Sequence, residues 1–256
     1  MTDETVISIL RNNDRRILQA PAPPTSNFVP ALERSLSGFG DSARELAVLY
    51  LAKFNPPGSG TLLLRLTIDS SLQTAAAAAR SLAGGDFSVA GSEIVAAIPS
   101  RRDRHVRGYL YLAAGNNKNP PALSAFRDVA KLEKDPEAAE SAEVAAVKLG
   151  GDAERKSFLK RIEEAQPGKA LQIQDQMLYV GDPKLAKALL PWFDNTAGVM
   201  RLGSDRQAAG SVHMCDLAAW IAYRLGVKFD LQPQYLTNFA PAVLAAAKAA
   251  CAALPD

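Results

Sequence analysis

Short helical segments that end in small residues recur along this chain at nearly even spacing. An interval near 31 residues, with two helical patterns in each unit, is typical of a solenoid built from helix pairs. The last interval is longer because it carries an insertion, DNTAGVMRLGSDRQAAG. The period predicts an all-α fold, a right-handed α-solenoid of about six helix pairs. The glycines at the helix ends, spaced 31, 35, 31 and 45 residues apart, are Gly84, Gly115, Gly150, Gly181 and Gly226.

Each unit begins with one helical pattern, such as PALSAFRDVAKLE, and continues with an alanine-rich one, such as AAAAARSLAGGD. Neither helix could bury its apolar face alone, whereas stacked pairs bury a shared core. The segment TLLLRLTI looks strand-like, but it lies where the first helix of a unit is expected. Carboxylates before the second helices can accept hydrogen bonds from free N–H groups. The aspartates in such positions are Asp41, Asp69, Asp103 and Asp135.

The two ends of the chain differ from this pattern. Residues 1–29 combine a weak helical stretch with APAPPTSNFVP, whose prolines cannot continue a helix, and we expect an N-terminal arm and linker. Residues 30–232 form the predicted solenoid. Residues 233–256 contain APAVLAAAKAACAALP, which predicts one helix that caps the last repeat.

The second helices that close in LAGGD, LAAGN and LGGD resemble those of the HEAT-repeat family. The similarity is greatest to the short bacterial HEAT-like repeats also found in phycobilisome lyases, and it covers residues 30–230, about six units. It implies a scaffold but no particular activity, because this architecture hosts many roles. The family shares no catalytic residues, so none is carried over to this chain.

Composition narrows the function classes. The formal charge is +2, with 48% hydrophobic and 22% charged residues, so the whole chain offers no electrostatic reason to bind nucleic acid or anionic lipid. No window reaches the length of a membrane span. We expect a cytoplasmic monomer without a cofactor; an exported protein whose signal peptide has been removed is the alternative. Two cysteines give no disulfide framework, and Cys215 and Cys251 are either paired or buried as free thiols.

The segment GSVHMCDLAAWIAYRLG brings together three reactive side chains, those of His213, Cys215 and Asp216. On a helix, residues two apart project about 200° from each other, so His213 and Cys215 cannot face one metal ion. Zinc also needs three or four ligands, and the chain has one further histidine and one further cysteine. We therefore predict no metal and no catalytic site. Cys215 is expected to be buried, Ser211 to cap the helix and Asp216 to be solvated.

A second candidate is the basic segment RRDRHVRGYLYLAAG, which runs from Arg101 to Gly115. Arginine in the first turn of a helix opposes the helix dipole, so a functional reason for the cluster is considered. One interpretation is an anion or phosphate site. The other is a solvated face that pairs with acids of neighbouring repeats such as Glu93 or Glu140.

The third candidate is a surface on the concave side of the solenoid, formed by the second helices. Tyrosine, tryptophan and arginine are common at the centres of protein interfaces. Trp220 and Tyr223 could instead be covered by the C-terminal helix. The predicted binding residues are Arg104, Arg107, Tyr111, Gln172, Gln176, Tyr179, His213, Asp216, Trp220 and Tyr223.

These features predict a non-enzymatic scaffold that binds a protein or peptide partner. The alternative is a HEAT-like lyase, or a module for nucleic acid or a phosphate ligand, that uses the basic cluster from Arg101 to Arg107. Nucleic-acid binding is the weaker expectation, since it requires a basic stripe and this is the one dense basic cluster.

Overall fold

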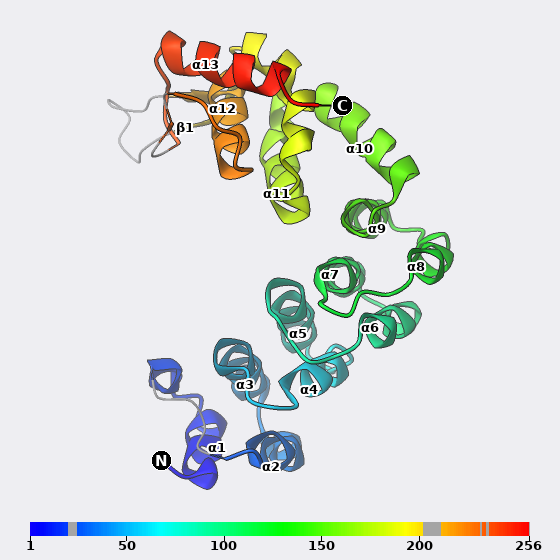
Figure 1. Ribbon diagram of the computed structural model, residues 1–256. Helices are drawn as coiled ribbons and strands as arrows, with labels where there is room; N and C mark the ends of the chain where they lie inside the picture. Colours follow the sequence, from blue (N-terminus) through cyan, green and yellow to red (C-terminus); the bar gives the residue numbers. More distant parts are fainter. Residues whose placement is uncertain (20–24, 202–210, 231, 234–235, 256) are drawn as a thin grey trace. The chain divides into compact units, whose positions relative to one another are not determined.

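Helices make up most of the computed structural model, which describes residues 1–19, 25–201, 211–230, 232–233 and 236–255 (Figure 1). This confirms the all-α class. The chain forms two compact units, Met1–Gly151 and Asp152–Asp256, which we call unit 1 and unit 2. Among the described residues, no helix is both long and apolar enough to cross a bilayer.

All regular secondary structure among the described residues of unit 1 is helical. Its 3₁₀ helices are η1 (Arg15–Gln19), η2 (Leu36–Gly38) and η3 (Ile98–Ser100). Its α-helices are α1 (Asp3–Arg11), α2 (Phe28–Ser35), α3 (Asp41–Phe54), α4 (Ser59–Leu66), α5 (Leu72–Gly84), α6 (Gly91–Ala97), α7 (Arg104–Asn116), α8 (Leu123–Ala130) and α9 (Pro136–Lys148).

Long and short helices alternate in unit 1 and form two rows (Figure 1). In the long-helix row, α3 packs on α5, α5 on α7 and α7 on α9. In the short-helix row, α2 contacts α4 and α6 contacts α8. The rows are joined because α4, α6 and α8 each pack on the long helix that follows. One continuous core runs through both rows, with fully buried residues such as Leu46, Leu63, Ala78 and Leu110.

Small residues allow the long helices to approach one another. A Cβ atom added at Gly108 in α7 would lie 3.2 Å from the Ser141 hydroxyl oxygen of α9, which is tighter than an ordinary contact. Ala78 and Ala79 of α5 and Ala145 of α9 are likewise completely buried. Alanine in these helices therefore favours helix formation and also permits close packing between helices.

The predicted helix starts are confirmed at two of the four aspartates. Asp103 accepts hydrogen bonds from the backbone N–H groups of His105 and Val106, and Asp135 caps α9 in the same way. The other two lie nearby but do not cap. Asp41 is the first residue of α3, whose cap is Gly40, and Asp69 precedes Ser71, which caps α5.

The glycines of the repeat have two different roles. Gly150, Gly181 and Gly226 follow helices with φ of +88°, +73° and +89°, the left-handed conformation expected at a helix C-terminus. Gly84 and Gly115 lie instead in the last turns of α5 and α7. The TLLLRLTI segment contributes to α4, as its place in the repeat predicts.

The N-terminal stretch differs from the arm that the sequence suggests. Helix α1 packs on α2 and α3, and its residues Val6 and Leu10 are buried in the core of unit 1. An apolar stripe of three positions in a nine-residue helix was sufficient to place it there. Residues 20–24 of the expected proline-rich linker lie outside the described residues.

Unit 2 is less regular. It contains α10 (Asp152–Glu163), η4 (Pro167–Lys169), α11 (Ala170–Val180), η5 (Pro183–Asp194), α12 (Met214–Arg224), α13 (Pro241–Ala252) and the strands β1 (Gly198–Arg201) and β2 (Ser211–His213).

The insertion that lengthens the last repeat interval explains the strands. β1 lies within the insertion and β2 follows it directly, and the two pair in antiparallel fashion, so the described residues contain one small sheet where the sequence predicted helices alone. Residues 202–210 lie outside the described residues. The core of unit 2 includes Trp192 of η5, which is buried and donates its indole N–H to the Ile162 carbonyl oxygen at 2.7 Å. Helix α13 packs on α12 and η5.

Candidate functional site

A salt bridge recurs between successive long helices of unit 1. It joins the fourth residue of one long helix to a carboxylate two residues before the N-cap of the next. Arg44 of α3 pairs in this way with Asp69, which precedes the Ser71 cap. Arg107 of α7 pairs with Glu133, which precedes the Asp135 cap. We call each such pair of positions a slot.

The Arg107–Glu133 slot is closed tightly. The guanidinium donates from Nε to Glu133 Oε2 at 2.7 Å and from Nη2 to Oε1 at 2.9 Å, which is bidentate pairing. Its Nη1 also donates to the carbonyl oxygens of Arg101 and Arg102. The side chains are 18% and 4% exposed. The hydrogen bond from Arg107 lowers the pKa of Glu133, and the same bond raises the pKa of Arg107.

The Arg44–Asp69 slot has the same design. Arg44 Nε lies 3.0 Å from Asp69 Oδ2, and Nη1 donates to the Phe39 carbonyl oxygen at 2.8 Å. Both side chains are mostly buried, at 16% and 11% exposure. Arg44 therefore connects the residues at the end of η2, the first turn of α3 and the residues that precede α5.

The slot between these two is different. The fourth residue of α5 is Ala75, and the position two before the Asp103 cap holds Arg101 in place of an acid. Arg101 donates to three neutral acceptors: the Thr67 hydroxyl at 2.7 Å, the Ser100 hydroxyl at 2.5 Å and the Leu64 carbonyl at 3.3 Å. Burial lowers the pKa of its guanidinium, which stays charged at neutral pH.

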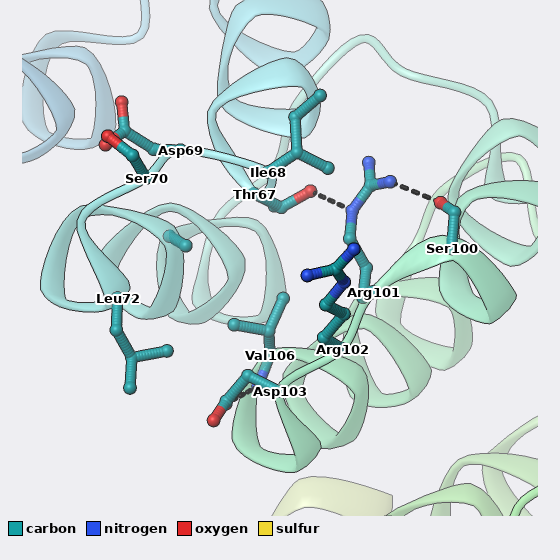
Figure 2. Close-up of a pocket in the computed structure, with 11 residues that line it drawn as sticks. Thr67, Ile68, Asp69, Ser70, Leu72, Ser100, Arg101, Arg102, Asp103 and Val106 are labelled. Carbon is teal, nitrogen blue, oxygen red and sulfur yellow. Dashed lines mark hydrogen bonds between the residues drawn. The ribbon is translucent and has the colours of Figure 1, made fainter.

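A cavity of about 380 Å³ opens at this slot (Figure 2). It lies on the side of the slot where the neighbouring slots contain an arginine and this slot contains Ala75. Its lining residues are Thr67, Ile68, Asp69, Ser70, Leu72, Ala75, Ser100, Arg101, Arg102, Asp103 and Val106. A smaller cavity of about 280 Å³ lies beside the Arg107–Glu133 pair.

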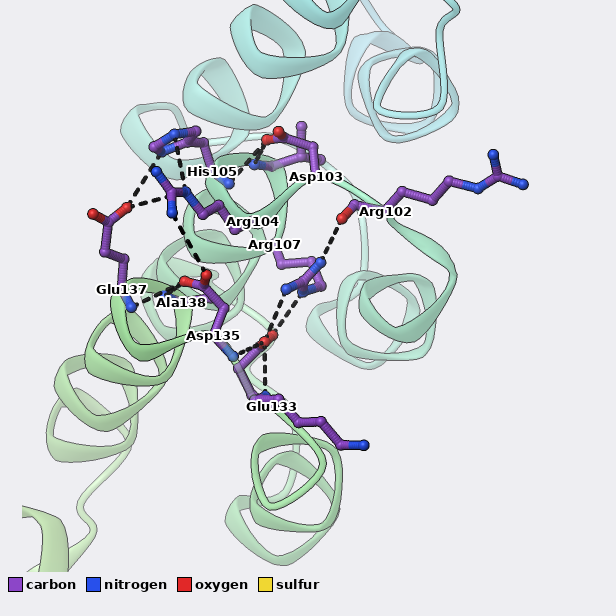
Figure 3. A network of polar contacts seen from close by, with 11 residues as sticks. Arg102, Asp103, Arg104, His105, Arg107, Glu133, Asp135, Glu137 and Ala138 are labelled. Atoms are coloured by element: carbon purple, nitrogen blue, oxygen red, sulfur yellow. Dashed lines mark hydrogen bonds and ion pairs between the residues drawn. The ribbon is translucent and has the colours of Figure 1, made fainter.

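The carboxylates at the cavity are already engaged. Asp69 binds Arg44 and accepts from the Ser71 backbone N–H, while Asp103 caps α7. Arg102 is exposed, and its guanidinium points away from the neighbouring polar network (Figure 3). Within the described part of the chain, neither Arg101 nor Arg102 has an ion-pair partner. Asp69 is paired with Arg44 and Asp103 is the one unpaired acid of the described lining, so the unpaired charge at the cavity is positive overall.

The remaining basic residues of the predicted cluster are balanced by acids. Arg104 lies 3.8 Å from Asp135 and 3.4 Å from Glu137, and it is half exposed (Figure 3). Pairing with acids of a neighbouring repeat was one of the two interpretations offered by the sequence. The acids are Glu133, Asp135 and Glu137, not the suggested Glu93 or Glu140.

Tyr111 corrects the predicted surface. It is 1% exposed and packs edge-on against Phe126, with ring centroids 5.6 Å apart. Burial raises its pKa to about 12. The sequence predicts Tyr111 on an exposed face of its helix, whereas its ring packs on Phe126 of α8, and α5, α6 and α9 also pack on α7. Tyr111 therefore belongs to the core.

The predicted binding residues of unit 2 lie on α11 and α12. Gln172, Gln176 and Tyr179 are half-buried on α11, and burial raises the pKa of Tyr179. Trp220 and Tyr223 are half-buried on α12, with ring centroids 5.8 Å apart, and Arg224 lies over the Trp220 ring at 5.6 Å. Helix α13 packs on α12 without covering this aromatic pair completely.

Asp216 has a structural role. It is 2% exposed, not solvated, and accepts from the backbone N–H groups of His213 and Phe239 at 2.9 and 2.8 Å. The half-exposed His213 ring contacts the same carboxylate, with Nδ1 3.1 Å from Oδ2. His213 is the N-cap of α12, whereas Ser211, the predicted cap, lies in β2.

The two thiols of unit 2 are buried and free. Burial raises the pKa of Cys251 to about 12 and also raises the pKa of Cys215. Among the described residues, no group of three potential metal ligands comes together.

Comparisons of the chain with models of protein families, with curated proteins and with solved structures each give no match. The resemblance to HEAT repeats therefore stays a prediction.

Proposed function

We propose that this chain is a non-enzymatic scaffold of the HEAT-repeat type, an α-solenoid that binds a protein or peptide partner. The observation that carries the proposal is the regular stacking of helix pairs in unit 1 around one continuous core. Such a stack repeats the same surface features at regular intervals, which suits an extended chain as partner.

Two surface features support partner binding. The first is the cavity at Arg101 and Arg102, where positive charge lies beside exposed apolar side chains. The second is the cluster of Trp220, Tyr223 and Arg224 on α12, three residue types that are enriched at the centres of protein interfaces.

The charge distribution favours a protein over nucleic acid. Arg104 and Arg107, two arginines of the basic cluster considered for an anionic ligand, are paired with carboxylates. A nucleic-acid groove requires a run of unpaired basic residues along the phosphate path. Two adjacent arginines at one cavity are better suited to a single anionic group.

Affinity purification of the full chain from the cells that produce it, followed by crosslinking mass spectrometry, tests this proposal. We expect a recurrent protein partner that rebinds the chain stoichiometrically when both are purified. Recovery of a coloured or nucleotide small molecule without any protein would contradict the scaffold and favour the ligand-binding alternative.

A further inference from the structure

We infer that the cavity between α5 and α7 binds a carboxylate, namely an aspartate or glutamate side chain that lies beside an apolar residue in the partner's chain. This rests on the proposed function and names the chemistry of the segment that the scaffold recognises.

The repeat itself shows which group is missing. In the slots on either side, an arginine and a carboxylate from successive helix pairs form one ion pair. In the central slot the arginine is present at the position of the acid, and alanine stands at the position of the arginine. The positive charge of Arg101 is therefore left for a group from outside the chain.

The hydrogen-bonding capacity of Arg101 agrees with this assignment. A guanidinium has five N–H donors, of which the structure uses three on neutral acceptors. A partly buried guanidinium is stabilised when a carboxylate binds it, because its charge is then paired. Arg102 adds a second positive charge at the rim (Figure 2).

The helix ends at the cavity argue for a carboxylate over a phosphate. Phosphate sites commonly use free backbone N–H groups at a helix N-terminus. Here the Asp103 side chain occupies two N–H groups at the start of α7, and Ser71 occupies one at the start of α5. The guanidinium groups are left as the main donors, and a carboxylate can pair with their planar fork without using any helix N–H group.

The apolar part of the lining indicates what accompanies the carboxylate. Ile68 and Leu72 line the cavity and are 64% and 54% exposed, among the most exposed large apolar residues of the described chain. An apolar side chain next to the acid would cover them and gain from the burial. The volume of about 380 Å³ is within the range of small-ligand pockets.

Fluorescence anisotropy with labelled peptides tests the inference on the full chain. The probe is a capped peptide of alternating leucine and glutamate, and the matched peptide has glutamine in place of glutamate. We expect the glutamate peptide to bind at least about tenfold more tightly and to weaken as salt is added. Equal binding of both peptides, or no binding of the glutamate peptide, would overturn the inference.

Three variants locate the site. Arg101→Gln/Arg102→Gln should weaken binding at least about tenfold, since it removes both cations of the cavity. Ala75→Arg/Arg101→Glu rebuilds the ion pair of the neighbouring slots and should abolish binding by filling the cavity. Arg34→Gln removes one exposed arginine of α2 and should leave binding unchanged. Circular dichroism and thermal unfolding confirm that each variant is folded.

The outcomes separate this inference from the proposed function. A natural partner that binds the wild type and the Arg101→Gln/Arg102→Gln variant equally would leave the scaffold standing and refute the carboxylate site. Peptide binding that the variants do not affect, or that inorganic phosphate displaces more effectively than acetate, would also refute it. Failure to recover any protein partner would count against the scaffold itself.

Discussion

The slots at Arg107 and at Ala75 have the same position in the repeat and opposite contents. At Arg107, a largely buried guanidinium meets a largely buried carboxylate from the next helix pair, and the lining of the cavity of about 280 Å³ beside them includes these two charges, which already pair with each other. At Ala75, the arginine stands on the other side, its acceptors are neutral and a cavity remains. The comparison suggests that the ion pair in a closed slot stabilises the packing of successive helix pairs. The open slot lacks this ion pair and has a cavity in which another molecule can bind.

Breaking the closed slot should have the largest effect. Glu133→Gln leaves Arg107 largely buried without its counter-charge, and loss of one member of a buried pair costs about 3 kcal/mol. Urea unfolding followed by circular dichroism measures this loss. The matched control is Glu33→Gln, which breaks the exposed pair with Arg65 and should cost less than about 1 kcal/mol. Equal losses of unfolding free energy in the two variants would show that the Arg107–Glu133 pair stabilises the fold no more than an exposed ion pair does.

Low pH should also lower the contribution of this slot to the free energy of unfolding, by less than the Glu133→Gln substitution does. The pKa of Glu133 is lowered from 4.5 in the folded chain. Between the folded pKa and pH 4.5 the unfolded chain therefore binds more protons than the folded chain. Its contribution to the free energy of unfolding is complete above pH 4.5 and is lost as the pH falls through the folded pKa. Unfolding free energies at a series of pH values should fall less steeply for Glu133→Gln than for the wild type. Parallel profiles would refute this assignment.

A more exposed ion pair in unit 2 provides an intermediate case. Arg155, the fourth residue of α10, pairs with Asp182 at 2.6 Å, and the side chains are 29% and 30% exposed. Asp182 also caps η5, a role that asparagine can fulfil. Asp182→Asn should therefore lose the ion pair alone, about 0.5 kcal/mol, measured by thermal unfolding. A loss as large as that of Glu133→Gln would mean that burial does not set the strength of these pairs.

The open slot should show the smallest change. Arg101→Gln removes hydrogen bonds to neutral acceptors but also a partly buried charge, and these effects oppose one another. We expect the free energy of unfolding to change by about 0.5 kcal/mol or less in urea titrations. A loss near that of Glu133→Gln would indicate that Arg101 is a structural residue, contrary to its assignment as a binding group.

Local patterns in the sequence were sufficient for part of the fold. The helices, the caps at Asp103 and Asp135 and the left-handed Gly150 depend on neighbouring residues, and these were predicted correctly. The burial of Tyr111 could not be read from one helix, since its ring packs against Phe126 of α8. Asp216 likewise accepts a hydrogen bond from the backbone N–H of Phe239, which is distant in the sequence.

The candidate site was partly visible in the sequence. The basic cluster was recognised, but Arg104 and Arg107 were selected in place of Arg101. Which arginine lacks an acid depends on contacts between residues about 26 positions apart, such as Arg107 and Glu133. Aligning the repeats by their caps would have revealed the exchange of Ala75 and Arg101, because it breaks a pattern that the flanking repeats share.

The distribution of tryptophan and cysteine has a spectroscopic consequence. The chain has two tryptophans and two cysteines, and all four lie in unit 2. Tryptophan emission and the reactivity of the buried thiols therefore report on the opening of unit 2 alone. Tyrosine emission comes from both units, and Tyr50, Tyr109 and Tyr111 contribute the part from unit 1. Recording both signals during one denaturant titration would reveal whether the two units unfold in a single step or independently, without the need for an added label.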